Sequence, residues 1–230
     1  MKDKKKDKFL SDLLGYSSYN INSKNEINHF RKINNNFLLI LKTSNHLSTE
    51  DCKNFDIKMR SKLITFKKKI LKNKKFDFEC RFAQKKDINS IIKICKENPY
   101  GSRFEKDPFI SHKFLMNYRS IWLKNFFKKK RGDYLIIAKK KNIILGFMLL
   151  IKEKKNLRID QILVRNKFKR KGVAKTLINY SSDYFSNNYN EIIAGTYDHN
   201  LTAKKLYKRL NFKREKRIKY IYHLYPKNYN

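Results

Sequence analysis

The sequence predicts a mixed α/β fold, an α+β arrangement in which helices flank a central mixed sheet with antiparallel hairpins. The chain has 230 residues, of which 40% are hydrophobic and 14% aromatic, which is enough to bury most of its unfolded surface. From Phe78 onwards the apolar spacing indicates the order β, α, α, β, β, β, α, β, α, β. Because several strands follow one another without a helix between them, this order argues against a simple doubly wound sheet.

The first 75 residues carry no chemical motif and are rich in Asn and Lys. We interpret residues 1–75 as a poorly patterned N-terminal region ahead of one domain over residues 76–230. A helix is expected there from Ser48 or Thr49, a capping candidate with Asp51 close behind, to about Lys72. The sequence leaves open whether this region is a true domain or a helical extension.

The domain over residues 76–230 begins with a strand at 78–83 and a helix capped by Asp87. Apolar residues recur in this helix at i, i+3, i+4 and i+7, namely Ile88, Ile91, Ile92 and Cys95. Turns at 98–101 and 107–108 precede a second helix through Phe114, Tyr118 and Trp122. Strands at 134–138 and 143–151 then predict a hairpin.

A further strand is expected at 157–164, with a regular alternation of its side chains. Its two faces would hold Leu157, Ile159, Gln161 and Leu163 on one side, and Arg158, Asp160, Ile162 and Val164 on the other. Gly172 then starts a helix, residues 192–197 form a strand, and Asn200 caps a helix through Tyr207. Alternating apolar residues at 218–224 predict the last strand.

The charge is unusual, because 56 Lys and Arg residues against 20 Asp and Glu residues give a formal net charge of +36. Such a surface is typical of nucleic-acid binders. However, Lys, Asn, Ile, Phe and Tyr are all abundant, as an AT-rich genome would produce, and we favour this compositional interpretation. A positive field also attracts small anionic ligands.

Cysteines and apolar runs indicate the compartment. The three cysteines form no CxxC pair, so neither a zinc site nor a disulfide framework is indicated and a reducing cytoplasm suits them. The four histidines other than His223 show no spacing of metal ligands. The longest apolar run, nine residues at 143–151, is too short to span a bilayer, so we expect a cytoplasmic protein without membrane partners.

The segment 163–177 is the most informative part of the chain. The six glycines form neither a dinucleotide-binding GxGxxG loop nor a GxxxxGK[ST] phosphate loop, so any phosphate site is built differently. Here five of the seven residues at 165–171 are basic, and Gly172 follows where a helix begins. Backbone N–H groups at a helix N-terminus bind anions, so a pyrophosphate would fit. Taken alone, the segment is equally consistent with a basic surface turn.

Two motifs at matching separation resemble the GNAT N-acetyltransferases. Val164, Lys169, Lys171, Gly172, Val173 and Ala174 resemble the acyl-CoA loop V-x-P-x-x-[QR]-x-x-G-x-[GA]. Asn200, Ala203, Leu206, Tyr207, Leu210 and Phe212 resemble the downstream signature N-x-x-A-x-x-L-Y-x-x-x-G-F. The resemblance covers about residues 78–225 and implies the GNAT acyl-CoA N-acyltransferase fold, with acetyl-CoA as cosubstrate and no metal.

The loop and the signature also depart from the family pattern. Asn166 replaces the common proline, Lys169 the Gln or Arg, and Asn211 the glycine before Phe212. Asn tolerates the left-handed conformation better than most residues, so Asn211 is a mild change at a helix C-terminus. Lys169 supplies charge without a planar donor fork, which matters little if backbone groups bind most of the pyrophosphate.

The resemblance implies a set of cofactor-binding residues. They are Leu163, Val164, Lys169, Arg170, Lys171, Gly172, Val173, Ala174, Lys175, Asn200, Ala203 and Tyr207. The strand that ends at Val164 would give backbone N–H groups to the thioester, and the loop at 169–175 would hold the pyrophosphate.

The resemblance also assigns catalytic roles. Tyr207 matches the tyrosine that acts as general acid towards the thiolate, with a core aromatic as the plainer interpretation. Asp160 is our first candidate for the general base and His223 the second, and each could instead only orient its neighbours.

A finer resemblance concerns the acceptor. The residues that look like the sugar-nucleotide amine acetyltransferases, typified by dTDP-fucosamine acetyltransferase, are Thr196, Trp122 with Asn125, Tyr222, His223 and residues 102–104. Those enzymes carry a small, degenerate acetyltransferase-like N-terminal domain where this chain has residues 1–75. Arg103, Trp122 and Thr196 would then bind substrate, with Arg103 pairing with a substrate phosphate or simply lying at the surface.

The expected function is therefore acetyl transfer to the primary amine of a nucleotide-linked amino sugar, by a monomer or a homodimer. The alternatives are a protein N-alpha or lysine acetyltransferase of the ribosomal type, and a basic RNA- or ribosome-binding protein on an inactive GNAT fold. Intact Gly172, Asn200 and Tyr207 argue against loss of activity, and no RNP motif supports nucleic acid as a partner.

Overall fold

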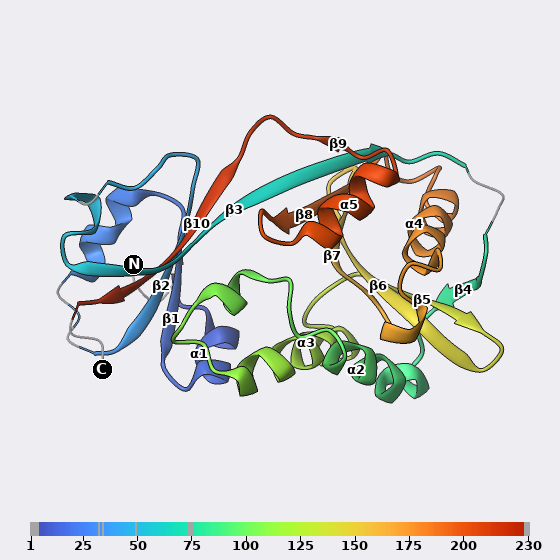
Figure 1. Ribbon diagram of the computed structural model, residues 1–230, viewed down its shortest axis with the longest axis horizontal. Helices are drawn as coiled ribbons and strands as arrows, with labels where there is room; N and C mark the ends of the chain where they lie inside the picture. The colour runs from blue at the N-terminus through green and yellow to red at the C-terminus, as the bar shows by residue number, and fades with distance from the viewer. Residues whose placement is uncertain (1–4, 32, 34, 49, 73–75, 228–230) are drawn as a thin grey trace.

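The structure is a computed structural model that describes residues 5–31, 33, 35–48, 50–72 and 76–227. Within these residues, nine strands form one sheet in the order β1-β2-β10-β3-β8-β7-β6-β5-β4, and the short β9 (Lys213–Arg214) pairs with β3. The sheet extends along the length of the molecule, and β3 and β10 connect a half with β1 and β2 to a half with β4 to β8 (Figure 1). The predicted mixed fold with antiparallel hairpins is confirmed.

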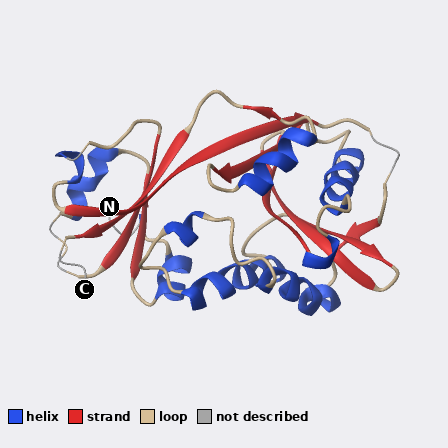
Figure 2. Cartoon of the chain, viewed as in Figure 1, coloured by secondary structure: helices blue, strands red, loops and turns tan. Residues whose placement is uncertain are grey.

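The half formed by residues 76–214 has helices on both faces of the sheet (Figure 2). Its strands are β4 (Glu79–Phe82), β5 (Tyr134–Lys140), β6 (Ile143–Glu153), β7 (Asn156–Val164) and β8 (Glu191–Tyr197). Its helices are α2 (Ile88–Lys96), α3 (His112–Phe127), α4 (Val173–Tyr184) and α5 (Leu201–Arg209). Each of these elements lies where the apolar spacing predicted it.

Side chains of each strand divide between two hydrophobic clusters. Leu135, Ile137, Phe147 and Leu149 pack against α2 and α3, on what we call the α3 face. Their sequence neighbours, among them Ile136 and Met148, pack against α4 and α5, on the α4/α5 face. This period-two division lets one sheet bury both faces.

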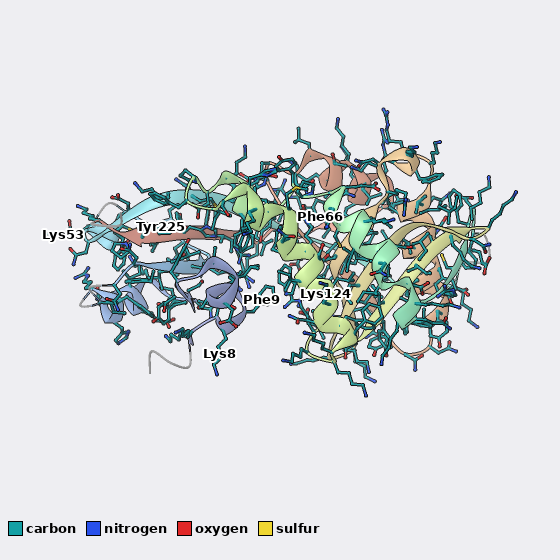
Figure 3. The ribbon with its side chains drawn as sticks, turned by 90° about the horizontal axis from the view of Figure 1, so that it is seen from below. Lys8, Phe9, Lys53, Phe66, Lys124 and Tyr225 are labelled. Atoms are coloured by element: carbon teal, nitrogen blue, oxygen red, sulfur yellow. The ribbon has the colours of Figure 1, made fainter. Side chains whose placement is uncertain are left out.

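The other half is built from α1 (Lys8–Leu14), β1 (Ser17–Ile21), β2 (Phe37–Thr43) and β10 (Lys219–Pro226). Leu38 and Ile40 of β2 pack against α1 and α3, whereas Leu39 and Leu41 pack against the 3-10 helix Lys24–Phe30 on the opposite face. Viewed from below, Phe9 of α1 lies beside α3, and its ring stacks on that of Trp122 at 5.9 Å (Figure 3). Other 3-10 helices are Glu50–Cys52, Lys85–Asp87, Arg103–Lys106 and Asn166–Phe168.

The helix predicted from residue 48 or 49 to residue 72 is wrong, because most of this segment is β3 (Phe55–Lys69). Thr49, the alternative cap, lies outside the described residues. From Phe55 to Leu63 the strand pairs with β10, and from Leu63 to Lys69 it pairs with β8. The N-terminal region therefore supplies an inner strand to the sheet of the domain that follows it. The degenerate-domain interpretation of residues 1–75 stays a prediction.

Candidate active site

The parallel strands β7 and β8 separate partway along their length. They pair only as far as Ile159 and Ala194, after which β7 stays with β6 and β8 stays with β3. A cleft of about 760 Å³ lies at the separation, lined by Ile159 to Leu163 on β7 and Gly195 to Tyr197 on β8. Backbone groups of β7 that face the cleft have no partner on β8, so they are available to a ligand.

A β-bulge at Asp160 changes which side chains of β7 face each side. Leu149 of β6 pairs with Gln161 and Leu150 pairs with Ile159, so Asp160 is the extra residue. Before the bulge, Leu157 and Ile159 pack on the α4/α5 face, but after it Ile162 and Val164 do so. The regular alternation expected over 157–164 is therefore wrong, because one inserted residue exchanges the two faces. Leu163 packs on the α3 face instead.

The predicted pyrophosphate loop has a run of backbone amides without acceptors. Arg170 and Gly172 adopt left-handed backbone angles, with φ of 63° and 84°, and α4 starts immediately after them. Thr176 N is the first amide of the helix to bond backwards, to Gly172 O at 2.9 Å. Among the described residues, the amides from Arg170 to Lys175 have no hydrogen-bond acceptor. This arrangement fits a phosphate group, which accepts from several N–H donors at a helix N-terminus.

The side chains around this loop are mostly basic, with the carboxylate of Asp77 beside them. A Cβ atom on Gly172 would lie 3.0 Å from a carboxylate oxygen of Asp77, and the same carboxylate lies 3.9 Å from Lys175 Nζ. Lys169, Arg170, Lys171 and Lys175 belong to this loop or to the first turn of α4. Val173 is buried beneath it and Ala174 lies on the same turn. The loop thus combines unpaired donors with positive charge.

Asn200 connects α5 to the loop that covers the cleft. Its Oδ1 accepts from the amide of Ala203 at 3.1 Å, which confirms the predicted cap, and its Nδ2 donates to Gly101 O at 2.9 Å. Gly101 has φ of 93°, and a Cβ there would lie 2.8 Å from Asn200 Nδ2. Both polar atoms of the Asn200 amide are therefore engaged within the protein, while Ala203 lines the cleft. At the other end of α5, Asn211 adopts the left-handed conformation with φ of 59°.

Tyr207 lies on the α4/α5 side of the cleft and is 3% exposed. Its ring packs against Phe66 and Phe212 at centroid distances of 5.5 and 5.2 Å. Burial raises the pKa of Tyr207 well above its usual range. The phenol therefore carries its proton at neutral pH, which is the state a proton donor needs.

Asp160 is paired with Arg131, which lies across the cleft from Tyr207. Its two carboxylate oxygens accept from Arg131 Nη2 at 2.6 Å and Nε at 2.8 Å, and the guanidinium of Arg131 also stacks on Trp122 at 4.0 Å. A bidentate pair of this kind occupies both oxygens. The contacts favour a positioning role for Asp160, and its role as the base stays a prediction.

His223 is fully buried beside the cleft rather than in it. Its Nδ1 lies 2.5 Å from Asp107 Oδ2, and its Nε2 accepts from Arg103 Nε at 3.2 Å. Because Nε2 accepts this bond, the neutral tautomer with hydrogen on Nδ1 satisfies both contacts. Burial lowers the pKa of His223 to about 4, and the contact with Asp107 opposes this only in part. The only lone pair is thus engaged, so the geometry favours positioning of Arg103 over proton abstraction.

The three predicted substrate residues all line the cleft, on different faces. Arg103 Nη1 donates to Tyr197 OH at 3.1 Å, which places its guanidinium on the α3 face. Trp122 lies on that face too, between Phe9 and Arg131. Thr196 alternates with Ala194 and Ile192, so it belongs to the α4/α5 face.

Sequence analysis missed Gln161 as a site residue. The side chain is 3% exposed and lines the cleft, and neither Oε1 nor Nε2 has a partner among the described residues. A buried amide without partners is costly and points to a ligand. Its signal in the sequence was a polar residue placed, under the expected alternation, on the same face as Leu157, Ile159 and Leu163. Arg131 and Asp107 were missed as well, because no local pattern connects them to Asp160 and His223.

Comparison with known proteins defines the class. Residues 112–221 match the family model described as an acetyltransferase (GNAT) domain. The separated strands, the loop before α4 and the mixed sheet agree with this class. Residues 112–221 therefore match a GNAT acetyltransferase domain, and this match supports an acetyl-transferring enzyme.

The relatives that match are distant. The spore coat polysaccharide biosynthesis protein SpsD of Bacillus subtilis is 25% identical over 150 residues, which are 65% of this chain and 51% of that protein. The match thus spans about half the length of that relative. A functionally unknown conserved protein from Staphylococcus epidermidis has a TM-score of 0.67 at 14% identity, covering 99% of this chain and 93% of its own. A putative GNAT acetyltransferase from Novosphingobium aromaticivorans has a TM-score of 0.56 at 10% identity, with coverages of 88% and 79%.

No helix in the described part of the chain is both long and apolar enough to cross a membrane. No group of three or more His, Cys, Asp or Glu side chains there is arranged to hold a metal ion.

Proposed function

We propose that this protein is an acetyl-CoA-dependent N-acetyltransferase that acts on the primary amine of a nucleotide-linked amino sugar. The observation that carries the proposal is the cleft between β7 and β8, which side chains of both faces of the sheet line. On the α4/α5 face, the helix whose first amides lack acceptors packs against β7, one of the two strands that form the cleft. On the α3 face it is lined by arginines. Two substrates can thus meet from opposite faces.

Acetyl-CoA supplies the acetyl group as a thioester. The amides of residues 172–175 fit its diphosphate, and the free edge of β7 after Asp160 offers N–H groups to the thioester carbonyl. Tyr207 holds a proton at its phenol oxygen on the same face, ready for the departing sulfur. Arg103 and Arg131 give the acceptor side a positive field, which lowers the pKa of an ammonium group there and favours the neutral amine.

The amino-sugar assignment rests on two supports. One is the resemblance of residues 102–104, Trp122, Thr196 and His223 to sugar-nucleotide amine acetyltransferases. The other is the similarity to a protein named for spore coat polysaccharide biosynthesis. Both favour a sugar over a peptide as acceptor.

A screen of coenzyme A release tests the proposal. Full-length protein and acetyl-CoA are incubated with dTDP- and UDP-linked amino sugars, with peptides that carry free α-amines or lysines, and with polyamines. We expect release with one nucleotide-linked amino sugar at least tenfold above every peptide and polyamine. Preference for a peptide would replace the acceptor class, and the absence of release with any amine would refute the proposal.

A further inference from the structure

The α3 face of the cleft carries positive charges that no carboxylate balances. Three acidic side chains line the cleft, and each already pairs with at least one cation: Glu153 with Arg158, Asp160 with Arg131 and more distantly Arg158, and Glu215 with Lys67. Lys42, Arg103 and Lys219 also line it. Within the described part of the chain, none of these three has a carboxylate within 4.0 Å.

These cations come from both halves of the sheet. Lys42 follows Leu38 and Ile40 on the α3 side of β2, and its partner on β10 is Ile221, two residues from Lys219. This diagonal position places the two lysines near one another on one face. Arg158 comes from β7, and Arg103 from the 3-10 helix that covers the cleft.

Mutual repulsion shows that the charges share one space. Burial lowers the pKa of Lys42, the charges of Lys219, Arg158 and Arg103 lower it further, and the carboxylate of Glu153 opposes them in part. A half-buried lysine in such surroundings is unfavourable for the empty protein. A bound anion would remove this repulsion. We call Lys42, Arg103, Arg158 and Lys219 the cationic cluster.

From these observations we infer that the cationic cluster is an anion subsite for the acceptor, and that it binds the diphosphate of a nucleoside diphosphate derivative. Of the four cations only Arg158 pairs with carboxylates, those of Glu153 and Asp160, so the charge left over matches a group with two or more negative charges. Gln161, whose amide has no partner among the described residues, lies on the same face and fits the uncharged hydroxyl groups of the same molecule. This inference deepens the proposed function and rests on it for the acceptor's amine.

The inference gives residues 1–75 a role in the site. Lys42 comes from this region, and Lys219 is placed beside it by the pairing of β10 with β2. The same region supplies β3, which pairs with β10 beside the cationic cluster and with β8 further along the sheet. The N-terminal half would thus hold the charged end of the acceptor, while the domain after it holds the cofactor.

Pyrophosphate binding tests the subsite without any enzyme activity. Inorganic pyrophosphate is titrated calorimetrically into full-length protein saturated with coenzyme A, so that the site at α4 is already filled. We expect one site in the wild type and at least tenfold weaker binding for Lys42→Met, because an ionic hydrogen bond contributes about one order of magnitude or more. Lys96→Met, which removes an exposed lysine of α2 remote from the cleft, serves as the control and should bind like the wild type. Equal affinity in Lys42→Met and wild type, or no binding by the wild type, would overturn the inference.

Folding is checked in the same samples. Removing a repelled, half-buried charge should leave the melting temperature of Lys42→Met equal to that of the wild type or above it. If Lys42→Met binds pyrophosphate more weakly but keeps the melting temperature of the wild type, the loss of binding reports loss of the site and not of the fold. Should Lys42→Met prove less stable, Lys219→Met, at an exposed position, replaces it with the same expected loss of binding.

Kinetics then separates the subsite from the proposed function. For a nucleotide-linked amino sugar, Lys42→Met should lose at least ten times more kcat/KM than for the same amino sugar without phosphate. Equal losses on both sugars would refute the subsite while acetyl transfer stands. If pyrophosphate binding depends on Lys42 but no nucleotide-linked sugar is acetylated, the proposed acceptor fails and the anion subsite remains.

Discussion

We expect the buried His223 to make the fold less stable in acid, because its burial and its contact with Arg103 favour the neutral imidazole. The imidazole is fully buried, accepts from Arg103 through Nε2 and contacts Asp107 through Nδ1. A proton on Nε2 of His223 would face the guanidinium of Arg103 and would break the hydrogen bond that Arg103 Nε donates to Nε2. Burial accordingly lowers the pKa of His223 to about 4, against about 6.5 for an exposed histidine.

The magnitude follows from proton uptake by the unfolded chain. Between about pH 6.5 and pH 4, the unfolded histidine is protonated and the folded one is not, so acid favours unfolding. The free energy of unfolding then falls by up to about 1.4 kcal/mol per pH unit, which amounts to about 2 kcal/mol between pH 7.5 and pH 5. Above pH 6.5 neither state binds the proton and this contribution is constant.

Urea unfolding followed by circular dichroism, at several pH values from about 7.5 to 5, measures this change. The matched variant is His223→Gln, because a glutamine amide can accept from Arg103 and donate to Asp107 without titrating. We expect the wild type to lose about 2 kcal/mol more than His223→Gln over this interval. His112→Gln, at an exposed histidine, should behave like the wild type. Equal pH dependence in the wild type and His223→Gln, or a wild type that becomes more stable in acid, would refute the reasoning.

Two further sites, Gly172 and Tyr207, test the proposed cofactor side of the cleft, and a third, Gly146, tests how tightly the sheet packs beside it. Gly172→Glu places a carboxylate among the unpaired amides at the start of α4 and should abolish acetyl-CoA binding, as measured by calorimetry. The control Gly172→Ala adds backbone strain of about 1–2 kcal/mol but no charge, so it should keep measurable binding. Binding of acetyl-CoA by Gly172→Glu would contradict the loop assignment. Tyr207→Phe should lower kcat about a hundredfold with an unchanged Kd for acetyl-CoA, and full turnover would exclude the general-acid role. Gly146→Ala should lower the free energy of unfolding by about 1–3 kcal/mol, because its Cβ would lie 2.8 Å from Leu163 O; Gly195→Ala, where the nearest atom is 3.4 Å away, is the control, and equal stability of the two variants would show that the sheet relaxes.

Elements with a local signal were predictable from the sequence. The helix from Asp87 follows one helical apolar period, the hairpin of β5 and β6 follows two apolar runs around a polar turn, and Asn200 is a good capping residue, and the structure has all of them. β3 has no such signal, since Met59 and Leu63 pack in the core beside α1, whereas Phe66 and Ile70 pack in the core beside α4. Met59, Leu63, Phe66 and Ile70 thus recur at spacings of 4, 3 and 4, as on one face of a helix. A strand that passes between two cores can therefore imitate a helix.

The acceptor side of the site was less predictable than the cofactor side, for a related reason. The cofactor loop is continuous in sequence, so its motif contains most of the geometry. On the acceptor side, the faces of β7 depend on the bulge at Asp160, and a bulge leaves no mark in an apolar pattern. The partners of Asp160 and His223, which are Arg131 and Asp107, come from distant loops. Two candidate bases chosen for their place on a strand are consequently both engaged with an arginine, whereas the buried amide of Gln161 lines the cleft without a partner among the described residues. An amide cannot act as a base, so this geometry favours an amine that loses its proton to water in the positive field of the cleft.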